Sequence, residues 1–262
     1  MAGRGRPRSF DRTVALTRAM ETFWRRGYET ASLADLTAAM GINSPSLYAA
    51  FGSKEQLFRE AVELYAAVEG APIDRALTEE PTAFEAVAAV LRWNARAFTG
   101  DDRPTGCMVV LSAVNTADDA ARRCLAEVRA AGTDQIRERL ERGIREGDLP
   151  PDTDTATAAR FYTAIVQGMS VQARDGAGYE EVARVAERAI GAWEAVTGAP
   201  ARPVAPRDTA ERGPAPVRYS ADSPARPQAR PPAGSSAGSS ARSSARSSGS
   251  QSSGSSTGAI SS

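Results

Sequence analysis

Apolar residues recur along most of the chain at intervals of three and four, the spacing of one face of an α-helix. Alternation typical of strands is scarce, and the one short β-favouring run, residues 108–111, lies inside a longer helical pattern. The pattern predicts an all-α fold. About nine helices are expected, near residues 11–26, 32–40, 44–51, 53–69, 82–99, 107–115, 118–146, 153–174 and 179–197.

Residues with special helix-end preferences support several of these boundaries. Ser32 with Asp35, and Ser53 with Gln56, have the spacing of a capping box at a helix start. Gly27 and Gly41 are expected to end the first two helices, because glycine tolerates the left-handed conformation of a C-cap. A short helix is expected to start at Ser44, with Pro45 at its first helical position.

The helical pattern stops abruptly after residue 198. Residues 199–262 are rich in Ser, Ala, Arg, Pro and Gly and have no apolar periodicity. Such a segment cannot bury enough surface to offset its ordering entropy, so we predict a disordered tail. The last helical stripe before it, in residues 179–197, is wide and suggests a surface for a partner subunit.

Charge and composition exclude several classes of site. The chain of 262 residues has no histidine and only two cysteines, Cys107 and Cys124, which argues against metal sites and catalytic triads. We therefore predict no enzyme activity, catalytic residue, metal or cofactor. No apolar run is long enough to cross a bilayer, and a cytoplasmic protein is expected. Net charge is zero, yet residues 1–8 form a basic arm through Arg4, Arg6 and Arg8.

Residues 32–51 have the layout of a helix-turn-helix, with the turn at Gly41, Ile42 and Asn43. The second helix of such a motif enters the major groove of DNA and reads bases with its N-terminal residues. The expected contacts to bases and phosphates include the basic arm together with Ser32, Ser44, Pro45, Ser46, Tyr48, Ala49 and Lys54.

Several fixed motifs in residues 23–58 resemble the DNA-binding domain of the TetR/AcrR family of repressors. The matching positions are Arg25-Arg26-Gly27-Tyr28, Gly41-Ile42, Ser46-Leu47-Tyr48, Phe51, Ser53-Lys54-Glu55 and Leu57-Phe58. Many members have a basic residue where Ser44 stands and a histidine or aromatic where Ala49 stands. Gly106-Cys107 and residues 167–176 are similar to the ComR-like branch of the family.

The resemblance implies a domain order of basic arm (1–8), DNA-binding domain (9–69), effector-binding and dimerisation domain (70–198) and tail (199–262). It implies a homodimer joined through residues 153–174 and 179–197, and a pocket for a small-molecule effector in the helices before them. Expected pocket residues are Trp93, Phe98, Met108, Ser112, Phe161, Tyr162, Ile165 and Met169. Cys107 could sense oxidants, although a free cysteine is more often a small buried apolar residue.

The function expected is that of a repressor that binds a palindromic operator and leaves it when an effector binds. Two alternatives stay open. A helical enzyme or carrier that merely retains a helix-turn-helix would bind a small molecule without sequence-specific DNA affinity. An activator, or a nucleoid-associated protein aided by its basic tail, would also bind DNA, and in the latter case nearly regardless of sequence.

Overall fold

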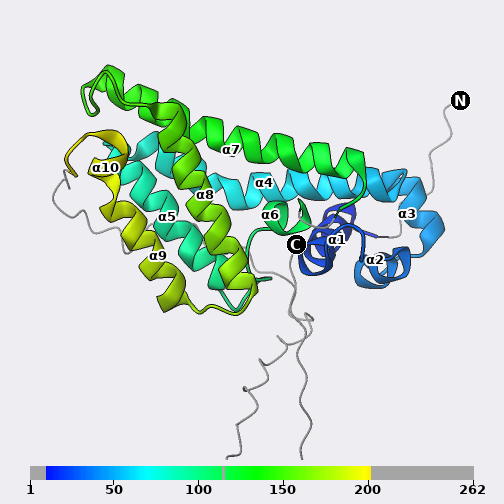
Figure 1. Ribbon diagram of the computed structural model, residues 1–262. Coiled ribbons are helices and arrows are strands. Elements are labelled where there is room, and N and C mark those ends of the chain that lie inside the picture. The colour runs from blue at the N-terminus through cyan, green and yellow to red at the C-terminus, as the bar shows by residue number, and fades with distance from the viewer. Residues whose placement is uncertain (1–9, 114–115, 202–262) are drawn as a thin grey trace, which may run out of the picture. The chain divides into compact units, whose positions relative to one another are not determined.

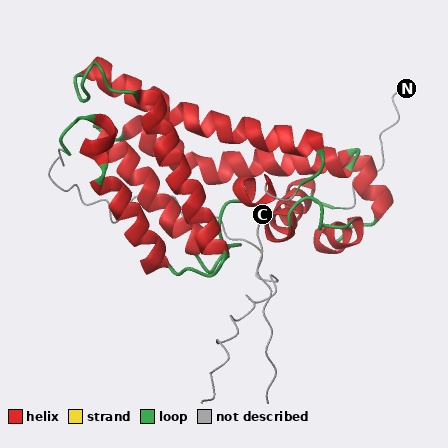
Figure 2. Cartoon of the chain, in the orientation of Figure 1, coloured by secondary structure: helices red, strands yellow, loops and turns green. Residues whose placement is uncertain are grey.

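In the computed structural model, residues 10–113 and 116–201 are described, and all regular structure within them is α-helical (Figures 1 and 2). The all-α prediction is therefore confirmed. The basic arm with Arg4, Arg6 and Arg8 and the tail from residue 202 onward lie outside the described residues. The tail was predicted from residue 199, but Ala199 is buried and its N–H donates to the Thr197 hydroxyl, so packing continues past that boundary.

Ten helices run through the described residues, and most match the predicted ranges closely. They are α1 (Arg12–Arg26), α2 (Leu33–Met40), α3 (Ser44–Phe51), α4 (Lys54–Glu79), α5 (Ala83–Thr99), α6 (Met108–Ala113), α7 (Asp119–Glu146), α8 (Thr155–Arg174), α9 (Tyr179–Gly191) and α10 (Trp193–Thr197). Helices α1 to α3 lie together at the N-terminal end of α4, and α7 runs beside α4 (Figure 1).

Short polar side chains begin these helices, because the first backbone N–H groups of a helix have no partner within it. Ser32 and Asp35 form the predicted reciprocal capping box at the start of α2. Ser53 accepts from the N–H of Gln56 at 3.0 Å, as expected for the start of α4. For α3 the cap is Asn43, whose side chain accepts from the N–H of Ser46 at 2.9 Å. Pro45 is therefore the second residue of this helix and not the first.

Helix α4 continues well beyond the predicted domain boundary between residues 69 and 70. It runs without interruption to Glu79 and contains Pro72, which lacks the N–H that would bond within the helix. It contacts α1, α5 and α7. Its first half, from Leu57 to Tyr65, contributes to the buried cluster that includes α1, whereas Leu77 near its end belongs to the other cluster. One helix therefore belongs to both halves of the described chain.

Two clusters of buried apolar side chains form the core. The first is built on α1 to α4, with Trp24, Phe23 and Phe58 among its large members, and it also includes Met108 of α6 and Leu125 of α7. The second joins α5, α8 and α9 with parts of α7 and the end of α4, and its members include Leu91, Tyr162 and Trp193. The N-terminal core is thus completed by residues from far along the chain.

The helix predicted over residues 179–197 is wrong as a single element. The chain breaks at Ala192, and α10 follows as a separate short helix. The wide apolar stripe predicted to need a partner subunit is largely buried within the chain, since Val182, Ala186, Ala189 and Trp193 belong to the second core cluster. The partner for this stripe is α5, which packs closely against α9.

Polar contacts tie the end of α1 to the second half of the chain. The Glu29 carboxylate accepts from the Thr116 hydroxyl and from the N–H groups of Ala117 and Asp118, at 3.1, 2.9 and 3.2 Å. The Arg174 guanidinium at the end of α8 donates to the carbonyl of Arg25. The turn after α1 is therefore held at two separate points.

Candidate DNA-binding surface and internal cavity

The turn between α2 and α3 has the geometry that the sequence predicted. Gly41 is left-handed, with φ of 67°, and its N–H donates to the Ala38 carbonyl. The N–H of Ile42 then reaches back to the Thr37 carbonyl at 3.1 Å. These bonds end α2 at Met40 within one turn, so α3 can start at Ser44 at an angle to it.

Helix α3 buries one face and exposes the other. Leu47 and Phe51 are buried against the rest of the N-terminal cluster. Ser44, Pro45, Tyr48 and Ala49 are exposed, with Tyr48 47% exposed despite its aromatic ring, and Ser46 is half-buried. An exposed face of small polar and apolar groups on the second helix of a helix-turn-helix can enter a major groove.

Lys54 and Ser32 are the two expected contacts that flank this face. The Lys54 ammonium lies 4.6 Å from the centre of the Tyr28 ring, a cation–π arrangement that holds it at the N-terminus of α4. Burial, followed by the charge of Asp118, raises the pKa of Tyr28 to about 12, so the ring stays a neutral phenol. The Ser32 hydroxyl is exposed but already bonds with Asp35 in the α2 cap, at 2.6 Å to the carboxylate.

A cavity of about 340 Å³ lies between the N-terminal cluster and the helices α4, α5, α7 and α8. Its walls are mainly apolar, and its aromatic residues are Trp24, Tyr65, Trp93 and Phe98. Most polar groups in the lining already have partners. Asn94 donates to the Val90 carbonyl, Gln135 donates to Asp74, and Glu69 forms an ion pair with Arg103.

Two of the eight residues expected in an effector pocket, Trp93 and Phe98, line this cavity. The other six do not belong to its lining. Met108 and Met169 are fully buried in the two core clusters, and Tyr162 packs on Phe161 and Trp193 in the second. Ile165 is packed against that second cluster, and Ser112 is buried in α6 away from the cavity.

The lining residues that sequence reasoning missed are mostly small or lie on the next face of the same helices. On α8 they are Thr163, Val166 and Gln167, which alternate with the predicted set. On α7 they include Gly132, whose missing side chain leaves open space toward a Cβ position. The only sequence signal for these positions was a polar residue, such as Gln167, within an apolar helix.

Cys107 also lines the cavity, but its surroundings favour a thiol rather than a reactive thiolate. Burial raises the pKa of Cys107, and a hydrogen bond with the Tyr65 side chain only partly offsets that effect. A thiolate is the species that reacts with oxidants, and a raised pKa makes it scarce at neutral pH. Cys124 is buried in α7, and burial raises its pKa as well.

Among the described residues, no helix is long and apolar enough to span a bilayer, and no cluster of Cys, Asp or Glu could hold a metal ion. An exposed second helix in a helix-turn-helix, joined to a helical domain with an apolar cavity, defines a DNA-binding transcriptional regulator of the helix-turn-helix class.

Comparison with known proteins makes this class specific. Residues 15–61 match the model for "Bacterial regulatory proteins, tetR family", and residues 85–190 match that for "Tetracyclin repressor-like, C-terminal domain". The chain is 36% identical over 193 residues to the HTH-type transcriptional repressor ComR of Escherichia coli K12, covering 72% of this chain and 92% of ComR. It is 31% identical over 185 residues to the repressor BdcR of the same organism, covering 71% and 90%.

A solved structure supports the same assignment. A cysteine mutant of the TetR family regulator CifR, complexed with a 26-base-pair operator duplex, is 49% identical and superposes with a TM-score of 0.71. The match covers 72% of this chain and all of the CifR chain. The chain belongs to the TetR family and is a sequence-specific DNA-binding transcriptional regulator.

Proposed function

We propose that the protein is a homodimeric repressor that occupies a palindromic operator and is released when a small molecule fills the cavity between α4, α5, α7 and α8. The observation that carries the proposal is the pairing of an exposed α3 face with an apolar cavity in one chain. The kinship with ComR and BdcR, both named as repressors, supports repression over activation. An operator-bound regulator works in the cytoplasm, and no enzymatic role is needed.

The dimer is assigned to the outward face of α8. Ala164 and Val171 are exposed on it, and Phe161, Ile165 and Gly168 are half-buried on the same face at helical spacing. A face of this kind can pack closely against its own copy across a two-fold axis. Two α3 helices related by that axis would read half-sites about one DNA turn, or roughly 10 base pairs, apart.

The effector is inferred to be a mainly apolar small molecule. Its cavity is within the usual range of roughly 300–1,000 Å³ for small-molecule sites, and the lining carboxylate of Glu69 and the Asn94 amide are already bonded within the protein. A charged ligand would have to break these bonds to gain its own. The effector acts only through a difference in affinity between the operator-bound and free states.

The first test is selection of the purified full-length protein on randomised duplex DNA. An enriched palindrome with half-sites about one helical turn apart is expected. If the folded protein enriches no sequence, that result would contradict a sequence-specific regulator and favour a nucleoid-associated protein that binds DNA regardless of sequence. Binding of small apolar molecules without binding of any duplex would instead favour a small-molecule carrier that merely retains a helix-turn-helix.

Tyr48 and Lys54 are expected to contact operator phosphates. Replacing Lys54 by Gln should weaken binding across all sequences and reduce the salt slope of the logarithm of the affinity by about one. Tyr48→Ala should weaken binding by about tenfold or more, and Tyr48→Phe isolates the share of the hydroxyl. Fluorescence anisotropy at several salt concentrations measures both effects. Unchanged affinity in Lys54→Gln and Tyr48→Ala would show that α3 docks differently.

A cavity-filling substitution can stand in for the unidentified effector. Gly132 lies in α7 and lines the cavity, and no heavy atom lies within 4 Å of the position its Cβ would take. Gly132→Leu should fill part of the cavity without harming the helix, because leucine has the higher helix propensity. We expect operator affinity to fall about tenfold, within the usual range of allosteric coupling. Ala130→Leu, on the exposed face of α7, is the matched control.

A further inference from the structure

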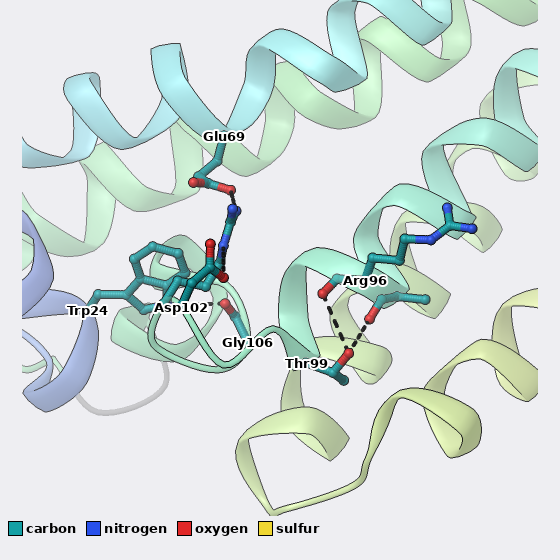
Figure 3. Close-up of polar contacts among 8 residues, drawn as sticks. Trp24, Glu69, Arg96, Thr99, Asp102 and Gly106 are labelled. Atoms are coloured by element: carbon teal, nitrogen blue, oxygen red, sulfur yellow. Dashed lines mark hydrogen bonds and ion pairs between the residues drawn. The ribbon is translucent and has the colours of Figure 1, made fainter. Parts of the chain in front are cut away.

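Trp24 is, among the described residues of α1 to α3, the one that reaches the cavity lining. Its ring is 2% exposed and packs edge-on against Tyr65, with ring centres 4.8 Å apart. Its indole N–H donates to the Gly106 carbonyl at 3.1 Å in a buried hydrogen bond (Figure 3). The Trp24 side chain thus comes from the DNA-binding domain, lines the cavity and bonds to the segment between α5 and α6.

The acceptor belongs to residues 100–107, here called the α5–α6 loop, and its position is closely fixed. The Gly106 N–H donates to the Phe98 carbonyl at 2.9 Å, and the Cys107 N–H donates to the Ser170 hydroxyl at 2.8 Å. Gly106 itself is left-handed, with φ of 74°. Phe98 and Cys107, on either side of the carbonyl that receives the indole, both line the cavity.

A buried ion pair joins the same loop to α4. Arg103 of the loop contacts the Glu69 carboxylate at 2.7 Å, and the two side chains are 9% and 11% exposed (Figure 3). Arg103 also contacts Asp102 at 3.3 Å. Because Glu69 lines the cavity as well, three of the walls (α4, the α5–α6 loop and Trp24) are linked by polar bonds that water hardly reaches.

We propose that Trp24 is the positioning residue through which the cavity's contents alter the DNA-binding domain. The inference rests on the proposed effector function of the cavity. An occupant that displaces Phe98, Cys107 or Glu69 shifts the Gly106 carbonyl. The indole N–H must follow it or lose its partner, and a buried donor without a partner is costly. Helix α1 packs on both α2 and α4, so a shift of Trp24 changes the orientation of the helix-turn-helix.

The test is a double-mutant cycle on operator binding with the full-length protein. Trp24→Phe keeps an aromatic ring and removes the N–H. If Gly132→Leu alone weakens binding about tenfold, the same change made in Trp24→Phe should weaken it less than about threefold, since the two changes are coupled. The duplex is the sequence recovered by selection, and Ala130→Leu in both backgrounds controls for added bulk on α7.

Each outcome separates the two claims. Equal weakening by Gly132→Leu with and without Trp24→Phe overturns the inference and leaves the effector cavity standing. A folded Gly132→Leu protein with wild-type affinity overturns both the cavity's role and the inference. Thermal unfolding checks that each variant folds. If Trp24→Phe does not fold, Trp24→Met replaces it in the same cycle, because methionine also removes the indole N–H and keeps an apolar side chain, with the same expected loss of coupling.

A second readout needs no cavity mutation. Operator binding and the α5–α6 loop must influence each other reciprocally if Trp24 couples them. The rate of amide hydrogen exchange in residues 100–107 should change at least about threefold when wild-type protein binds the duplex. A change of this size lies within the usual range of allosteric coupling free energies. The change should be lost in Trp24→Phe. Identical exchange in free and bound wild-type protein would overturn the inference.

Discussion

At the scale of single residues, Gly106 shows how one backbone position can be fixed by several neighbours. A Cβ added there would lie 2.7 Å from the Ser170 carbonyl oxygen and 2.8 Å from a methyl carbon of Leu111. Its φ of 74° also disfavours any side chain. The residue combines a left-handed backbone with a site too tight for one methyl group.

We predict that Gly106→Ala destabilises the protein by about 2–4 kcal/mol, from backbone strain plus overpacking. Gly147→Ala is the matched control, because Gly147 has φ of 76° but open space around its Cβ position. It should cost only about 1 kcal/mol. Urea unfolding of the two full-length variants measures the difference. Equal losses would show that the loop relaxes around the added methyl group.

The cavity lining could not be predicted from residue type alone. Large side chains such as Tyr162 and Met169 were expected to line a pocket, yet they fill the core because they are large and apolar. A cavity remains where side chains are too small to fill the space, as at Gly132. Their positions depend on how helices pack, which local periodicity does not report.

At the scale of elements, the helix boundaries were largely predictable because capping is local. The side chain and the N–H group that form a cap lie within three residues of each other, so the sequence itself contains both partners. The continuation of α4 past Pro72 and the break at Ala192 were not predictable in this way. No side-chain cap marks the course of the chain at Pro72 or Ala192. The helices in contact, α5 and α7 with α4 and α8 and α9 with α10, pack through tertiary contacts that local sequence patterns do not contain.

The cap of α8 should make stability depend on pH. Hydrogen bonds from the Thr157 backbone and hydroxyl lower the pKa of Asp154, so its ionised form stabilises the folded state. That contribution is complete above the unfolded pKa of about 4 and is lost as pH falls through the folded value.

Asp154→Asn keeps a capping oxygen but no longer titrates. We expect the stability advantage of the wild-type protein over Asp154→Asn to shrink as pH falls from about 6 to about 3. Urea titrations at several pH values measure it. An advantage that stays constant over this range would contradict a titrating cap.

At the scale of the whole molecule, the proposed dimer depends on one face of α8. An arginine at position 164 would place a charge in the centre of that face, where the side chain is now an exposed methyl group. We expect Ala164→Arg to be monomeric by analytical ultracentrifugation and to lose operator affinity at least about a hundredfold, since one half-site contact replaces two. Ala126→Arg, on the exposed face of α7, should remain dimeric. A dimeric Ala164→Arg would place the interface elsewhere.

The composition of the N-terminal core has a consequence for how such regulators can be recombined. Met108 and Leu125 belong to the same buried cluster as Trp24 and Phe58, although some 50 residues or more separate the pairs in sequence. A chimera that joined α1 to α4 of one regulator to the remaining helices of another would therefore create a hybrid core, with each parent supplying half of a tightly packed contact. A new combination of DNA-binding and effector-binding domains keeps a well-packed core only when α6 and the start of α7 come from the same parent as the DNA-binding helices.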